Sequence, residues 1–140
     1  MKRWVMAGLL AFAFAGLAGC DEDDEESSGG SANSVAGTWN GTMVATRLMG
    51  QPVEESDVVP FTMNIKQTGE YIDVTFQANG YPGFFTGHYY HDVDRSIDFS
   101  TTADYTYSFF GNVAYGQGSM SGMWVVNIPG GMSGTWQASR

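Results

Sequence analysis

The chain has 140 residues and is acidic, with 15 aspartate and glutamate residues against six lysine and arginine residues and a net charge of −9. A surface of this sign repels phosphate backbones, so we expect no nucleic-acid binding. The single cysteine, Cys20, excludes an intrachain disulfide and a cysteine-rich zinc site. The sequence contains no Walker loop, nucleophile elbow, zinc-protease helix or CxxC pair, so we predict that it is not an enzyme and uses no cofactor and no metal.

Residues 1–19 have the organisation of a signal peptide. Lys2 and Arg3 form a positively charged start, residues 4–18 are apolar, and Ala18 and Gly19 supply the small side chains that a signal peptidase requires. About 15 apolar residues rise only about 23 Å as a helix, short of the roughly 20 residues that a membrane span needs. The sequence therefore predicts a removable signal rather than a transmembrane helix.

Leu17, Ala18, Gly19 and Cys20 resemble the lipobox of bacterial lipoproteins. The resemblance implies that Cys20 is joined by a thioether to diacylglycerol, carries acyl chains such as palmitate, and becomes the first residue of the mature protein. Stable anchoring takes two lipid chains or more, which this modification supplies. We therefore expect a protein that is held on a membrane of the bacterial cell envelope by lipid on Cys20, with its domain outside the cytoplasm. An unmodified cysteine at the end of an uncleaved helix is the alternative.

Residues 20–34 predict the lipidated cysteine and a flexible tether. Six carboxylates at residues 21–26 are followed by small and polar residues, and no large apolar side chain is available to form a core. Fourteen such residues have a mean reach of roughly 20 Å, which holds the domain off the bilayer. Asp21 directly after the cysteine resembles an inner-membrane retention signal of enteric bacteria, whereas the acidic run resembles a surface-export signal of other groups. Inner membrane, outer membrane and cell surface therefore remain open.

Residues 35–140 predict one all-β domain, because apolar and polar residues alternate with a period of two in short runs. Eight strands are expected, at residues 37–45, 61–66, 71–78, 84–90, 96–101, 105–115, 119–128 and 132–139. Residues 47–57, with Gly50 and Pro52, are predicted to form a loop. Sequential hairpins favour an eight-stranded antiparallel up-and-down barrel, because closure removes exposed strand edges; an open sandwich is the alternative.

The tripeptide Gly-x-Trp occurs at residues 37–39, 122–124 and 134–136. Residues i and i+2 share a strand face, so we predict that each glycine makes room for a large ring or allows a sharp bend. The first strand, with Gly37-Thr38-Trp39, resembles the opening of lipocalin-like proteins, whose barrels commonly pack this tryptophan under an arginine near the chain end. The resemblance implies a lipocalin-like barrel in which Arg140 lies over Trp39, a contact worth about 0.5–2 kcal/mol. It does not identify a ligand.

Seventeen of the 20 aromatic residues lie in residues 35–140, a density that favours a barrel filled by side chains. Neighbouring rings, as in Phe84-Phe85 and Phe109-Phe110, point to opposite faces, so some lie outside, where exposed rings can mark a binding patch. Packing, a small apolar or sugar ligand, and contact with another envelope protein remain open uses of the aromatics. If the barrel holds a ligand, the inward residues expected to line its pocket are Trp39, Phe61, Ile65, Phe76 and Trp124.

One titratable cluster stands out in the sequence, formed by His88, His91, Asp92, Asp94 and Asp98. His88 and His91 are three apart and would lie on opposite faces of a regular strand. Asp92 and Asp94 have the spacing that starts a calcium loop, but Ile97 stands where that loop needs glycine and no glutamate follows at its twelfth position. We interpret the cluster as an acidic hairpin turn.

The sequence thus predicts a monomeric, lipid-anchored envelope protein whose non-catalytic β-barrel acts as a binding or structural module. A lipocalin-type carrier of a small apolar ligand in the barrel interior is the first alternative. A protein-interaction module that uses exposed aromatic side chains is the second. A carrier requires an internal pocket, whereas an interaction module requires a filled interior and rings grouped on the outer face.

Overall fold

The computed structural model describes residues 33–54, 56–101 and 106–140. The strands are β1 (Gly37–Leu48), β2 (Gln51–Pro52), β3 (Val59–Thr68), β4 (Tyr71–Ala78), β5 (Tyr81–Tyr90), β6 (Ser96–Ser100), β7 (Thr106–Val113), β8 (Ser119–Asn127) and β9 (Met132–Ser139). These parts of the chain contain no helix, and so none that is long and apolar enough to cross a membrane. The predicted signal peptide, Cys20 and most of the tether lie outside the described residues.

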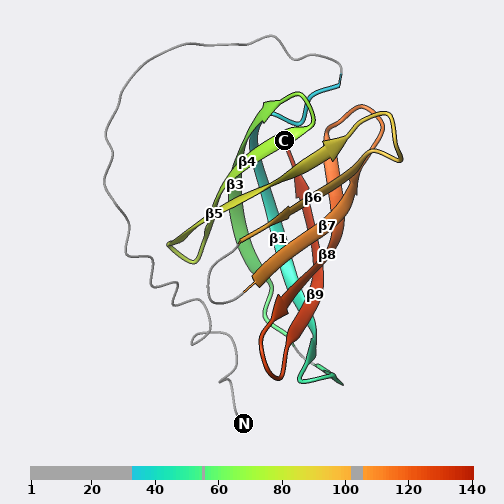
Figure 1. Cartoon of the computed structure of the whole chain (residues 1–140). Helices are drawn as coiled ribbons and strands as arrows, with labels where there is room; N and C mark the ends of the chain where they lie inside the picture. The colour runs from blue at the N-terminus through green and yellow to red at the C-terminus, as the bar shows by residue number, and fades with distance from the viewer. Residues whose placement is uncertain (1–32, 55, 102–105) are drawn as a thin grey trace.

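The sheet closes on itself to form a barrel. Strands β1 and β3 to β9 follow one another in antiparallel order, and β9 pairs back with β1 from Asn40 opposite Ser139 to Leu48 opposite Met132. Figure 1 shows the resulting tube, with β1 and β9 side by side. The predicted eight-stranded antiparallel up-and-down barrel is confirmed, with the two-residue strand β2 in addition.

The region after Ala45 differs from the prediction of a loop over residues 47–57. Strand β1 continues to Leu48, and the chain turns back at Met49 and Gly50 so that β2 pairs with its end. Both turn residues have positive φ, as a two-residue hairpin turn of this kind requires. Pro52 is tolerated because β2 lies at the edge of the sheet. The loop prediction was wrong at its start because the pairing of β1 with β9 extends this strand, and such a distant partner leaves no local pattern.

Inward side chains of the eight barrel strands form one hydrophobic core. At its centre is a connected group of aromatic rings with centroids 4.7–6.1 Å apart, made by Phe61, Phe76, Phe85, Phe99, Phe109 and Trp136. Each aromatic pair of this kind stabilises a fold by about 0.5–1.5 kcal/mol beyond the burial of its area. We therefore regard the central ring cluster as a main source of the barrel's stability.

The two C-terminal Gly-x-Trp tripeptides interlock across β8 and β9. Gly122 is the register partner of Trp136, and Gly134 is the register partner of Trp124. A Cβ atom on Gly134 would meet the Trp124 ring at 2.8 Å and would collide with the carbonyl oxygen of Val44. The prediction that a glycine makes room for a ring is confirmed at Gly134, although the ring belongs to the neighbouring strand and not to the same tripeptide.

We expect Gly134→Ala to lower the free energy of unfolding by about 1–3 kcal/mol, the usual cost of overpacking a core, because the added methyl group meets backbone that cannot yield. Gly118→Ala is the matched control, since nothing lies within 4 Å of a Cβ atom there. The control should change the free energy of unfolding by less than about 0.5 kcal/mol. Urea unfolding measures both variants, and equal stabilities would contradict the packing role of Gly134.

Candidate functional site

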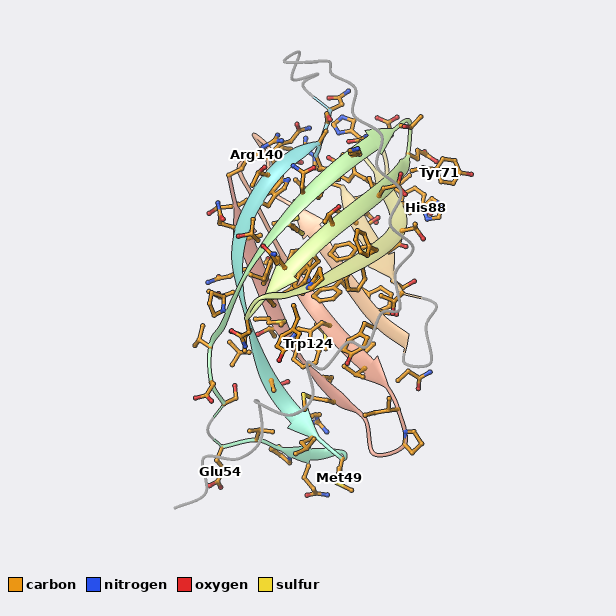
Figure 2. The ribbon with its side chains drawn as sticks, turned by 90° about the vertical axis from the view of Figure 1, so that its left-hand side faces the viewer. Met49, Glu54, Tyr71, His88, Trp124 and Arg140 are labelled. Carbon is orange, nitrogen blue, oxygen red and sulfur yellow. The ribbon has the colours of Figure 1, made fainter. Side chains whose placement is uncertain are left out.

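One end of the barrel is sealed by Trp39 and Arg140. The Trp39 side chain is completely buried, and its indole N–H donates to the carbonyl of Val35 at 2.8 Å. The Arg140 guanidinium lies over this indole, 4.7 Å from the ring centroid, so the predicted contact is confirmed. Figure 2 shows Arg140 at one end of the tube and Trp124 farther along it. The guanidinium also donates to three backbone carbonyls, those of Ser34, Ala36 and Gln117.

Tyr89 is a second buried group with polar partners. Its hydroxyl lies 3.3 Å from Nδ1 of His91. Burial raises the pKa of the Tyr89 phenol above its ordinary value, while the positive charges of Arg95 and Arg140 and a hydrogen bond with Gln117 oppose the shift. The phenol is therefore neutral at neutral pH, and we interpret it as a structural hydrogen-bonding group.

The five residues expected to line an interior pocket all point into the barrel and are buried: Trp39, Phe61, Ile65, Phe76 and Trp124. They are distributed along the core. Trp39 lies at the sealed end, Phe61 stacks on Phe76 with centroids 4.7 Å apart, and Trp124 lies opposite Gly134. Each has partners within the protein, which is the arrangement that a filled barrel requires.

The tryptophans of all three Gly-x-Trp tripeptides have their indole N–H groups bonded to backbone carbonyls. Trp39 donates to Val35, Trp124 donates to Thr135 at 3.2 Å, and Trp136 donates to Phe110 and Met123 at 3.2 and 3.1 Å. A buried indole needs such a partner, and here the backbone supplies it. The indole N–H groups of all three tryptophans are therefore satisfied within the protein.

The titratable side chains of residues 88–98 do not converge on one point. His88 projects outward from β5, with Nδ1 3.7 Å from Oδ2 of Asp98 on β6, whereas His91 lies in the following turn, with Nε2 3.9 Å from Oδ1 of Asp92. Asp94 lies in the same turn with a φ of 56°. Within the described ranges, no group of three or more His, Cys, Asp or Glu side chains is arranged to hold a metal ion. The interpretation as an acidic turn agrees with this geometry.

A row of side chains crosses the outer wall, with rings at its start, Asp98 at its centre, and Phe110 and Met123 at its end. In register order from β4 to β8 the row contains Tyr71, His88, Asp98, Phe110 and Met123. Tyr71 is 68% exposed, Phe110 51% and Met123 57%, and the centroids of the Tyr71 and His88 rings lie 5.0 Å apart. Figure 2 shows Tyr71 and His88 close together on the outside of the barrel. The prediction that one ring of each neighbouring pair lies outside is confirmed at Phe110, and the alignment of this ring with its neighbours follows from the strand register.

Beside this row the outer wall is hollowed along β9, a feature that we call the β9 groove. Two adjoining depressions of about 760 and 470 Å³ share Thr42, Ser121 and Gln137 in their linings. The first depression also contains the outward side chains Asn40, Asn112, Ser119 and Ser139, and the second contains Val44, Met123 and Thr135. This groove was not predicted from the sequence. The sequence does show small polar residues at alternate positions of β9. Their neighbours on β1, however, are determined by closure of the barrel and cannot be read from the sequence.

No protein-family model matches the chain, and comparisons with curated proteins and with solved structures give no significant match. No known protein therefore indicates a function for this chain.

We expect Trp39→Ala to cost about 3–5 kcal/mol of stability, as large-to-small core changes do, because the indole is fully buried under Arg140. Against a usual total of about 5–15 kcal/mol, this variant should melt far below the wild type or fail to accumulate. Phe84→Ala is the control, since this ring is 62% exposed on the outer wall. Thermal unfolding of both variants tests the sealing role of Trp39, and a near-wild-type melting temperature of Trp39→Ala would refute it.

Proposed function

We propose that this chain is a lipid-anchored protein of the cell envelope whose non-catalytic barrel acts as a binding or structural module through its outer wall. The observation that carries the proposal is the contrast between the two faces of the sheet. Inside, the large side chains are engaged with one another and with backbone carbonyls. Outside, apolar side chains such as Phe110 and Met123 remain exposed, and the β9 groove lies beside them.

The anchor in this proposal rests on the lipobox-like residues 17–20, and the place where the tether joins the barrel is given by the contacts of Ser34, the last residue of the predicted tether. The carbonyl of Ser34 accepts a hydrogen bond from Arg140, and the Ser34 hydroxyl donates to Gln67 at 3.2 Å. The tether therefore leaves the barrel at the end sealed by Trp39. A lipid on Cys20 would attach the barrel to the bilayer through this sealed end and leave the outer wall free of the attachment.

A contact with another envelope protein is the second candidate function. It is favoured by the adjacent exposed side chains of Phe110 and Met123, because exposed apolar side chains that lie together can mark an interaction site. A carrier of a small apolar ligand is the candidate that the packing favours least, since a ligand would have to displace the ring contacts of Phe61 and Phe76.

We expect Cys20→Ala to abolish incorporation of a fatty-acid probe and to leave a precursor that retains residues 1–19, because the thiol is the only attachment point for lipid. Metabolic labelling followed by mass determination measures both effects. Ser27→Ala, a change of similar size in the tether, should leave labelling and processing unchanged. Labelling of Cys20→Ala at the wild-type level would contradict the lipid-anchor proposal.

A further inference from the structure

The β9 groove is built from three cross-strand rows of outward side chains. A middle row runs from β7 to β1 through Asn112, Ser121, Gln137 and Thr42. On its sealed-end side lies a second polar row, formed by Ser119, Ser139 and Asn40. On its other side lies a more apolar row, formed by Met123, Thr135 and Val44, and Phe110 adjoins this row as the register partner of Met123. The groove therefore has a polar floor with one apolar flank.

The polar part of the groove carries no ionisable side chain. Its linings contain amides and hydroxyls, which both donate and accept hydrogen bonds, and no Asp, Glu, Lys, Arg or His. An anionic polymer or a phosphate headgroup would find no basic side chain in these linings, and a cation would find no carboxylate. The chemistry fits a neutral ligand with many hydroxyl groups.

Backbone pairing excludes the simplest mode of peptide binding in the groove. Strand β9 is bonded to β1 on one side and to β8 on the other, and β8 is bonded in turn to β7. Because the ladders already use the backbone donors and acceptors of these strands, an extended peptide has no sheet edge to join. A ligand in the groove must be held by side chains.

We propose that the β9 groove binds a neutral glycan chain. A sugar ring presents hydroxyls at its edge and apolar C–H groups on its faces, so it requires hydrogen-bonding side chains beside an exposed apolar surface. Asn112 and Gln137 supply the first, and Met123, which is more than half exposed, supplies the second, with the exposed Phe110 ring next to it in the strand register. Each depression has the volume of an ordinary ligand site, about 300–1,000 Å³, and two in a line accommodate an elongated chain. The inference rests on the proposed function as a binding module and names its ligand class.

The test uses the full chain, purified in detergent from whole cells so that the protein is recovered with or without a lipid, and titrated by calorimetry. The probes are four neutral oligosaccharides, cellohexaose, maltohexaose, chitohexaose and mannohexaose, with heparin and polygalacturonate as anionic counterparts. We expect saturable binding of at least one neutral probe and of neither anionic one. The proposal is overturned by binding of no neutral probe or by a preference for an anionic one.

Ser121→Trp locates the site, because Ser121 is exposed and lies in both depressions, so the ring fills the groove without entering the core. We expect binding at least about tenfold weaker, or about 1.4 kcal/mol. Ser100→Trp, at an outward position of β6 away from both depressions, is the matched control and should bind as the wild type does. Unchanged binding by Ser121→Trp, or equal loss in the two variants, overturns the proposal.

Gln137→Leu covers the case in which Ser121→Trp fails to fold. The change keeps the size of an exposed side chain and removes its hydrogen-bonding groups, so it should weaken binding while leaving the melting temperature within a few degrees of the wild type. Full binding by Gln137→Leu would contradict the site. Loss of glycan binding and loss of fatty-acid labelling are separate measurements, so the groove and the lipid anchor fail independently.

Discussion

The pairing of β1 with β9 is the constraint on which the rest of the molecule depends. Strand β1 bonds β3 through Gly37–Met43 and β9 through Asn40–Leu48, with a register shift between Ala45 and Arg47. Because it serves both neighbours, eight hairpin-linked strands become a closed tube whose inward faces are all covered. The β9 groove lies over this closure, since its polar rows draw side chains from both sides of it.

Closure also fixes the space that the inward side chains must fill. An eight-stranded barrel has little more than the volume of its own side chains, so large rings must be matched by small neighbours. Gly41 faces the Phe61 ring, Gly111 faces Trp136, and Gly134 faces Trp124. In each case a glycine on one strand makes room for a ring on another strand. In the proposed function, the outer wall is the surface for recognition.

The sequence predicted the features of the fold that depend on a single strand. Alternation of polarity located the eight barrel strands, and the opening tripeptide with the terminal arginine predicted the contact of Arg140 with Trp39. The sequence did not predict the features that depend on the register between strands. A period of two tells which face Ser121 occupies, but not that Asn112 and Gln137 are its neighbours. For the same reason the pairing of Gly134 with Trp124, the strand β2 and the β9 groove were not foreseen.

The position of the chain ends relates the groove to the proposed anchor. Ser34 and Arg140 meet at the sealed end, so a tether that begins at Cys20 reaches the barrel beside the last residue of β9. The groove follows β9 from Ser139, next to this end, toward Thr135. The groove lies on the barrel wall and not at the end to which the proposed tether is joined, so a chain-like ligand can lie along it without threading into the protein. In the proposed arrangement, a flexible tether with a mean reach of roughly 20 Å would leave such a polymer clear of the bilayer.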